Sequence, residues 1–239
     1  MMTGMAPAQN SAAQNPAAQN SAAATTRRSP LALAVLALLA YKPLHPYGVQ
    51  RLLKEWGKEK VVNIGQRASL YKTMERLAAA GLIAVRETER DQQYPERTVY
   101  EITDAGQQAV RSWIDDIVRA PKPEYPEFPA ALSFSMLLGP EAVLAALRER
   151  RETVEKALAK AKQDVADARQ WGLPKVTLLD DEYLVAVTEA ELRWVEGVVA
   201  ELESGDLTWS LELLQPFADA AEAEGGAEGG AEAEGGAAG

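Results

Sequence analysis

Cysteine is absent from this chain of 239 residues, and histidine occurs once, at His45. Without cysteine the protein has no disulfide and no thiolate to serve as a metal ligand or nucleophile. His45 lies next to Pro46, where a structural role is favoured over catalysis or metal binding. The sequence also lacks a catalytic triad, a phosphate-binding glycine loop and metal-ligand spacing. We therefore expect no enzyme, no catalytic residue, no cofactor and no metal site.

Long apolar runs are also missing from the sequence. The most apolar stretch, residues 31–40, follows Arg27 and Arg28 in the manner of a signal peptide. It has no small-residue cleavage pattern, and it is too short to span a membrane. We interpret it as a buried helix, and we expect a cytoplasmic protein with no membrane partner.

Both ends of the chain are poor in residues that could build a core. Residues 1–29 are dominated by Ala, Gln, Asn, Ser and Pro, and residues 217–239 by Ala, Gly and acidic residues. Neither segment can bury enough apolar surface to offset the entropy cost of ordering, so we expect two disordered tails. A proline cluster at residues 119–128 predicts a linker between the two folded domains, residues 30–118 and 129–216.

The formal net charge of −10 is distributed unevenly. Residues 30–118 carry 12 basic and 11 acidic residues, whereas residues 119–216 carry 11 basic and 18 acidic residues. The last 21 residues, from Asp219, contain six acids and no base. Because local charge governs DNA affinity, this balance permits DNA binding by the first domain without strongly supporting it.

Residues 30–118 have the pattern of a winged helix-turn-helix domain. Caps at Ser29 and Thr103, first-turn prolines and apolar spacing predict helices over about Pro30–Ala40, Pro46–Glu55, Gln66–Ala80 and Ala105–Val118. Gly81 lies where a helix needs a left-handed residue to end. Two short strands, residues 82–85 and 98–102, then flank a charged turn at residues 89–97, with Ile83 and Val85 on one face.

Polar side chains gather in the first two turns of the helix predicted from about Gln66. Arginine and glutamine suit bidentate contacts with base edges, whereas hydroxyl and ammonium groups suit phosphates. Taken singly, each residue is equally compatible with an ordinary solvated surface. Taken with the ribbon, they predict binding to double-stranded DNA by Gln66, Arg67, Ser69, Tyr71, Lys72, Arg76, Arg90 and Arg97.

Residues 129–216 predict an antiparallel helical hairpin. A short helix is expected at Ala130–Leu138, and an apolar seam in steps of four and three then runs from Leu147 to Ala168, as in a coiled coil. After a reversal at residues 171–174, a helix over Asp180–Glu203 returns with one apolar side, formed by Tyr183, Val187, Ala190, Trp194, Val198 and Leu202.

This hairpin is apolar on more than one face and therefore needs a partner, for which a second copy of the chain is the simplest candidate. The residues assigned to dimerisation are Leu147, Val154, Leu158, Val165, Val187 and Trp194. The expected fold class is mostly α: a winged helix-turn-helix domain, then an α-helical dimerisation domain, with a disordered tail at each end.

Four segments of the first domain resemble the PadR family of transcriptional regulators: Leu36–Gly48, Ala68–Leu77, Gly81–Ile83 and Arg97–Gly106. The resemblance implies a homodimeric repressor that a small molecule, often phenolic or drug-like, releases from a pseudo-palindromic operator. It also implies phosphate contacts by Tyr47 and Tyr71. Pro46 stands where the family usually has glycine, which bears on the turn before the second helix.

Several alternatives remain beside this interpretation. The first domain could bind a protein instead of DNA, as an interaction module. Trp113 and Trp194 could line an effector pocket, although packing in the core is favoured for both. The acids from Asp180 to Glu182 could bind a cation, although at a helix start they also interact favourably with the helix dipole. The acidic tail could compete with DNA for the first domain.

Overall fold

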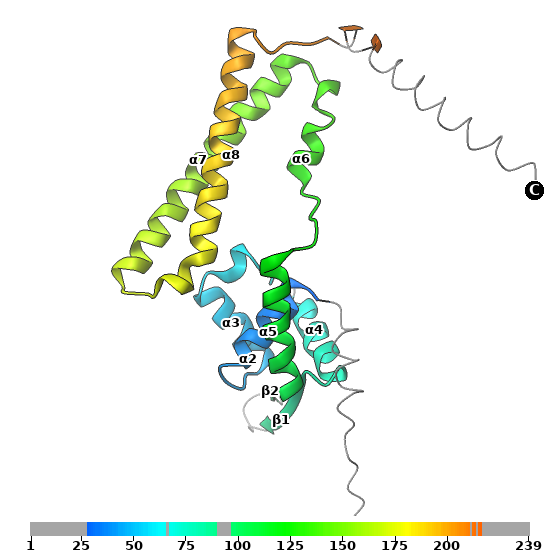
Figure 1. Ribbon diagram of the computed structural model, residues 1–239, viewed down its shortest axis with the longest axis vertical. Helices are drawn as coiled ribbons and strands as arrows, with labels where there is room; N and C mark the ends of the chain where they lie inside the picture. Colours follow the sequence, from blue (N-terminus) through cyan, green and yellow to red (C-terminus); the bar gives the residue numbers. More distant parts are fainter. Residues whose placement is uncertain (1–27, 66, 90–96, 211, 214, 217–239) are drawn as a thin grey trace, which may run out of the picture. The chain divides into compact units, whose positions relative to one another are not determined.

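The computed structural model describes residues 28–65, 67–89, 97–210, 212–213 and 215–216, which divide into two compact units between Pro123 and Glu124 (Figure 1). Of the two predicted tails, residues 1–27 and 217–239 lie outside the described residues. Within the described ranges, none of the helices combines the length and apolar character that a membrane span requires.

The first unit is a winged helix-turn-helix domain, and the predicted fold class is confirmed. Its elements are α2 (Pro30–Leu39), α3 (Pro46–Glu55), η1 (Lys58–Lys60), α4 (Arg67–Ala79), β1 (Ile83–Glu89), β2 (Arg97–Ile102) and α5 (Asp104–Arg119). Helix α2 lies in the middle of the domain and packs against α4, α5 and β2.

The domain begins earlier than the sequence predicted. The Ser29 hydroxyl accepts a hydrogen bond from the Ala32 N–H at 3.1 Å and so caps α2. Arg28, which we had placed in the tail, forms a 2.7 Å ion pair with Asp116 of α5. The folded domain therefore includes at least Arg28.

The ribbon of β1 and β2 is longer than the expected strands and irregular in register. It is antiparallel, with Ile83 opposite Ile102, and its register shifts between Val85 and Glu87, which leaves one extra residue as a β-bulge. Ile83 is buried, but Val85 is 54% exposed, so the shared apolar face that we predicted ends after one residue. Backbone pairing extends β1 past Val85 to Glu89, although the added residues are polar.

The second edge of β2 is tied to the segment between α2 and α3. Leu44 and Tyr100 exchange two backbone hydrogen bonds of 3.0 Å each, which form an isolated antiparallel bridge. This bridge fixes the start of α3 relative to the ribbon.

The second unit is a helical hairpin with a short helical segment before it. Its elements are α6 (Glu127–Leu132), η2 (Ser135–Leu137), α7 (Pro140–Gln170), η3 (Lys175–Leu178) and α8 (Leu179–Ser204) (Figure 1). The single helix expected at Ala130–Leu138 is wrong, because α6 ends at Leu132. The hydroxyls of Ser133 and Ser135 donate to nearby backbone carbonyls at 3.1 and 2.9 Å, which competes with helical bonding there.

The apolar seam between α7 and α8 was predicted correctly for the main apolar residues of α7 and only in part for α8, where Leu202 is buried as predicted. The four α7 residues assigned to dimerisation, Leu147, Val154, Leu158 and Val165, are buried in the single chain. On α8 the buried residues include Val195 and Val199, each one position beyond the predicted Trp194 and Val198. At these two positions the buried face of α8 is turned by about 100° from the predicted one.

Candidate nucleic-acid interface

The start of α3 is organised by a local cap. The Gly48 N–H donates to the His45 Nδ1 at 2.8 Å, so the histidine has the structural role that we expected. Pro46 occupies the first helical turn, where a backbone N–H has no partner within the helix. The proline therefore preserves the start of α3 in place of the family's glycine.

Helix α4 separates an apolar side from a polar one. Leu70, Met74 and Leu77 are buried in the domain core. Ser69 and Lys72 are exposed. A helix with one buried side and one side of small or polar residues facing solvent has the form needed to enter a DNA major groove.

The structure does not describe every side chain that we predicted to bind DNA. Gln66 and Arg90 lie outside the described residues. Arg67 begins α4 and Arg97 begins β2, but only their backbones fall within the description. Their assignment to base or phosphate contacts therefore stays a prediction.

Arg76 is placed differently from the expectation that it reaches DNA. The residue is half-buried, and its Nε and Nη2 atoms are shielded from solvent with no hydrogen-bond partner among the described residues. A guanidinium turned toward the protein in this way is poorly placed to contact a phosphate from the end of α4.

Two tyrosines line one small hollow near the starts of α3 and α4. Tyr47 and Tyr71, which are 57% and 50% exposed, line a small hollow of about 40 Å³ together with Pro46, Gln50 and Leu70. The Tyr47 ring stacks on the His45 ring, with centroids 6.0 Å apart. The structure thus brings together two of the predicted phosphate contacts, and both present hydroxyl-bearing rings to solvent.

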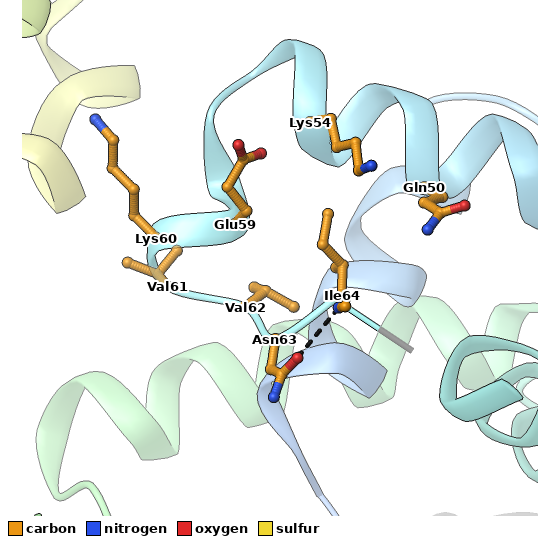
Figure 2. Close-up of a pocket in the computed structure, with 9 residues that line it drawn as sticks. Gln50, Lys54, Glu59, Lys60, Val61, Val62, Asn63 and Ile64 are labelled. Carbon is orange, nitrogen blue, oxygen red and sulfur yellow. Dashed lines mark hydrogen bonds between the residues drawn. The ribbon is translucent and has the colours of Figure 1, made fainter. Parts of the chain in front are cut away.

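A larger groove lies between α3 and the loop that precedes α4 (Figure 2). Its volume is about 500 Å³, and it is lined by Gln50, Lys54, Glu59, Lys60, Val61, Val62, Asn63, Ile64 and Gly65. The Asn63 Oδ1 accepts a hydrogen bond from the Gly65 N–H at 3.2 Å, which shapes the loop. Sequence reasoning missed this groove, although Tyr47, Gln50 and Lys54 recur at helical spacing.

The two tryptophans considered for an effector pocket lie in different units and different surroundings. Trp113 is 5% exposed and belongs to the core of the first unit. Trp194 is 46% exposed and meets the Phe128 ring edge-on, with centroids 6.1 Å apart. The Arg150 guanidinium lies over the Phe128 ring, 3.4 Å from its centroid.

Of the acids at the start of α8, Glu182 is engaged in two ion pairs. Glu182 binds Arg169 at 2.7 Å and Lys175 at 3.8 Å. The hydrogen bond from Arg169 lowers the pKa of Glu182 more than partial desolvation raises it. Within the described residues, no group of three or more metal-ligating side chains is present.

Residues 35–112 match the profile of the transcriptional regulator PadR-like family. The matched segment is the winged helix-turn-helix domain, so the resemblance predicted from the sequence is confirmed for that domain. No match was found among curated proteins.

Solved structures with the same fold match about three quarters of this chain and nearly all of their own length. Bacillus subtilis PadR in complex with operator DNA is 20% identical, with a TM-score of 0.57, and the match covers 72% of this chain and 98% of that one. The same protein in complex with p-coumaric acid is 18% identical, with a TM-score of 0.58 and coverage of 73% and 99%. The Vibrio cholerae virulence activator AphA is 20% identical, with a TM-score of 0.54 and coverage of 73% and 98%.

Proposed function

We propose, from the PadR-like character of its winged helix-turn-helix domain, that this protein is a DNA-binding transcriptional regulator of the cytoplasm. The observation that carries the proposal is the exposed polar side of α4, which presents Ser69 and Lys72 near the hollow that Tyr47 and Tyr71 line. In this arrangement α4 enters the major groove, while hydroxyl and ammonium groups at its edge contact phosphates.

We further propose that the regulator acts as a homodimer. The second unit exposes many large apolar side chains, which a single chain leaves in contact with water. They include Phe134, Leu137, Leu138, Trp171, Val176, Leu179, Tyr183, Val187 and Trp194. Exposed apolar surface on this scale marks an interaction site. Two winged-helix domains related by a twofold axis would then read a pseudo-palindromic operator.

Repression that a small aromatic molecule relieves is the mode of action that we propose. Support comes from the fold shared with B. subtilis PadR, which has been crystallised with operator DNA and with p-coumaric acid. In this chain Trp194 offers a half-exposed aromatic surface beside Phe128, whose ring also carries the Arg150 guanidinium. We therefore favour Trp194 over the buried Trp113 as an effector contact.

Four of the residues that the sequence assigned to dimerisation have a different role in this proposal. Leu147, Val154, Leu158 and Val165 are already buried in one chain, so they stabilise the hairpin itself. The dimer contacts that we propose are the exposed apolar side chains, with Val187 and Trp194 retained from the sequence prediction.

A gel-shift experiment on DNA from upstream of the protein's own gene tests DNA binding. We expect retardation at low salt that a specific competitor abolishes, and we expect Lys72→Gln to weaken binding to all sequences alike. The near-neutral charge of residues 30–118 favours one rival, a winged-helix module that binds a protein. Charge reversal at Arg67 and Lys72 separates the two, because the rival expects negligible DNA binding before the change.

A further inference from the structure

Helix α3 carries a polar stripe on the side away from the core. Tyr47, Gln50 and Lys54 are spaced three and four residues apart, so they share one face of the helix. Val49 and Leu53, each one position before a stripe residue and so turned about 100° from it, are buried. The stripe is about 10 Å long, because seven residues of α-helix rise by 1.5 Å each.

The stripe joins the two hollows of the first unit. Gln50 lines both the small hollow, with the two tyrosines, and the larger groove. Lys54, one turn further along α3, lines the larger groove as well. Figure 2 shows Gln50 and Lys54 projecting from α3 on the groove side, across from Val62 and Ile64 of the loop. A continuous track therefore runs along α3, from the start of α4 to the loop.

Lys54 is the strongest attraction for an anion on this track. It forms no ion pair with any residue in the described part of the chain, whereas its neighbour Arg51 pairs with Glu55 at 3.4 Å. The groove also contains Lys60 and one acid, Glu59, which leaves one net positive charge. The net charge of the lining therefore favours binding of an anion, although the Glu59 carboxylate weakens that attraction.

We propose that one strand of the DNA backbone lies along this track, with Lys54 and Gln50 contacting phosphates in addition to Tyr47 and Tyr71. The inference rests on the proposed function. Successive charges of one DNA strand are about 3.4 Å apart along the helix axis, so a stripe of about 10 Å spans several phosphates. In the helix-turn-helix arrangement, the helix before the recognition helix crosses the backbone.

The form of the track favours a polymer backbone over a small anionic ligand. The polar groups are distributed along an open helix face, and they do not converge on one enclosed point as in most small-molecule sites. Hydroxyl, amide and ammonium groups bind phosphates without reading bases. Contacts along the track therefore add affinity equally for every DNA sequence.

Salt-dependent binding by the full-length protein tests the assignment. Each phosphate contact contributes about 0.9 to the slope of log affinity against log salt concentration. Lys54→Gln should lower that slope by about 0.9, so that its affinity falls about 3.5-fold less than that of the wild type between about 50 and 200 mM salt. It should also weaken selected and random duplexes by the same factor.

Two further variants make the test decisive. Glu59→Gln should strengthen binding to both duplexes, because it removes a negative charge from the track. Lys156→Gln is the matched control: it removes one exposed lysine from α7 and should leave the slope unchanged. An unchanged slope in Lys54→Gln, or equal slopes in the Lys54 and Lys156 variants, would overturn the inference. If the wild type bound no DNA, the proposed function itself would fail.

Discussion

Gly106, in the first turn of α5, is the position where the first unit has no room for a side chain. A Cβ atom there would lie 2.0 Å from the Leu82 carbonyl oxygen and 2.7 Å from Cγ1 of Ile102. Two hydrogen bonds hold the helix start in this place, from the Thr103 N–H to the Leu82 carbonyl at 3.1 Å and from the Thr103 hydroxyl to the Gly81 carbonyl at 2.7 Å.

Replacement of Gly106 by alanine should therefore destabilise the first unit. The added methyl group meets backbone that cannot yield cheaply, so we expect Gly106→Ala to lower the free energy of unfolding by about 3 kcal/mol, near the upper end for overpacking. Chemical denaturation followed by circular dichroism measures the change. Gly197→Ala is the control, because its Cβ meets open space within α8. A loss of the same size in both variants would contradict the explanation.

Residues governed by their immediate neighbours in sequence were predictable. Ser29 and Thr103 cap helices as expected, and Gly81 has the positive φ of 70° that the end of α4 requires. The function of Gly106 was not predictable in the same way. It depends on Leu82, which is distant in sequence and which only the folded chain places beside α5.

At the scale of elements, the α7–α8 hairpin shows where periodicity reaches its limit. Apolar residues recur on more than one side of α8, so both Trp194 and Val195 fit a helical stripe, and the sequence alone does not choose between them. The buried position of Val195 depends on the fit against α7. A charged pair, Arg150 with Glu191, also crosses the hairpin, and no apolar pattern reveals it.

Four ion pairs connect α7 with α8 along the hairpin: Arg148 with Glu203, Arg150 with Glu191, Lys162 with Glu189, and Arg169 with Glu182. Hydrogen bonds from the lysine and arginine partners lower the pKa of Glu189 and of Glu182. A carboxylate with a lowered pKa in the folded state stabilises that state above its unfolded pKa, and the contribution disappears as pH falls through the folded pKa.

The second unit should accordingly lose stability in acid partly through Glu182. Thermal melts of the wild type should shift to lower temperature as pH falls below the ordinary glutamate value of 4.5. In Glu182→Gln this acid shift should be smaller, while stability at neutral pH should be reduced. Glu196→Gln serves as the control, because Glu196 is exposed on the same helix. Identical pH profiles for Glu182→Gln and the wild type would refute this role.

At the scale of the whole molecule, the exposed apolar side chains of the second unit predict self-association. Val187, 45% exposed on α8, lies in the surface that we assign to a second copy. A carboxylate at that position would be desolvated in the dimer, so Val187→Glu should produce monomers at concentrations where the wild type is dimeric. Sedimentation velocity measures the state.

The matched control for this substitution is Val61→Glu, which places the same charge on a similarly exposed valine of the first unit. We expect it to leave the dimer intact. A wild-type protein that is monomeric at all concentrations would contradict the assignment, as would a dimer that Val187→Glu leaves unchanged.

The fold class was predictable at this scale, because caps, prolines and periodicity agreed on the winged domain and on a helical hairpin. The DNA-binding surface was predictable only in part. Sequence reasoning concentrated on α4 and the ribbon, where charged residues are dense, and overlooked Gln50 and Lys54, whose significance comes from the groove between α3 and the loop. The DNA contact predicted for Arg76 is disfavoured, since its Nε and Nη2 atoms are shielded from solvent.

Selection of bound duplexes from a random DNA pool by the full-length protein tests the central claim most directly. A dimeric winged-helix regulator should enrich a pseudo-palindromic sequence whose half-sites are centred about 10 base pairs apart, or a multiple of that spacing. Recovery of this motif from independent pools is the result that we predict. Recovery of unrelated sequences with no shared motif, at a salt concentration where a known DNA-binding protein enriches its own site, would contradict the account.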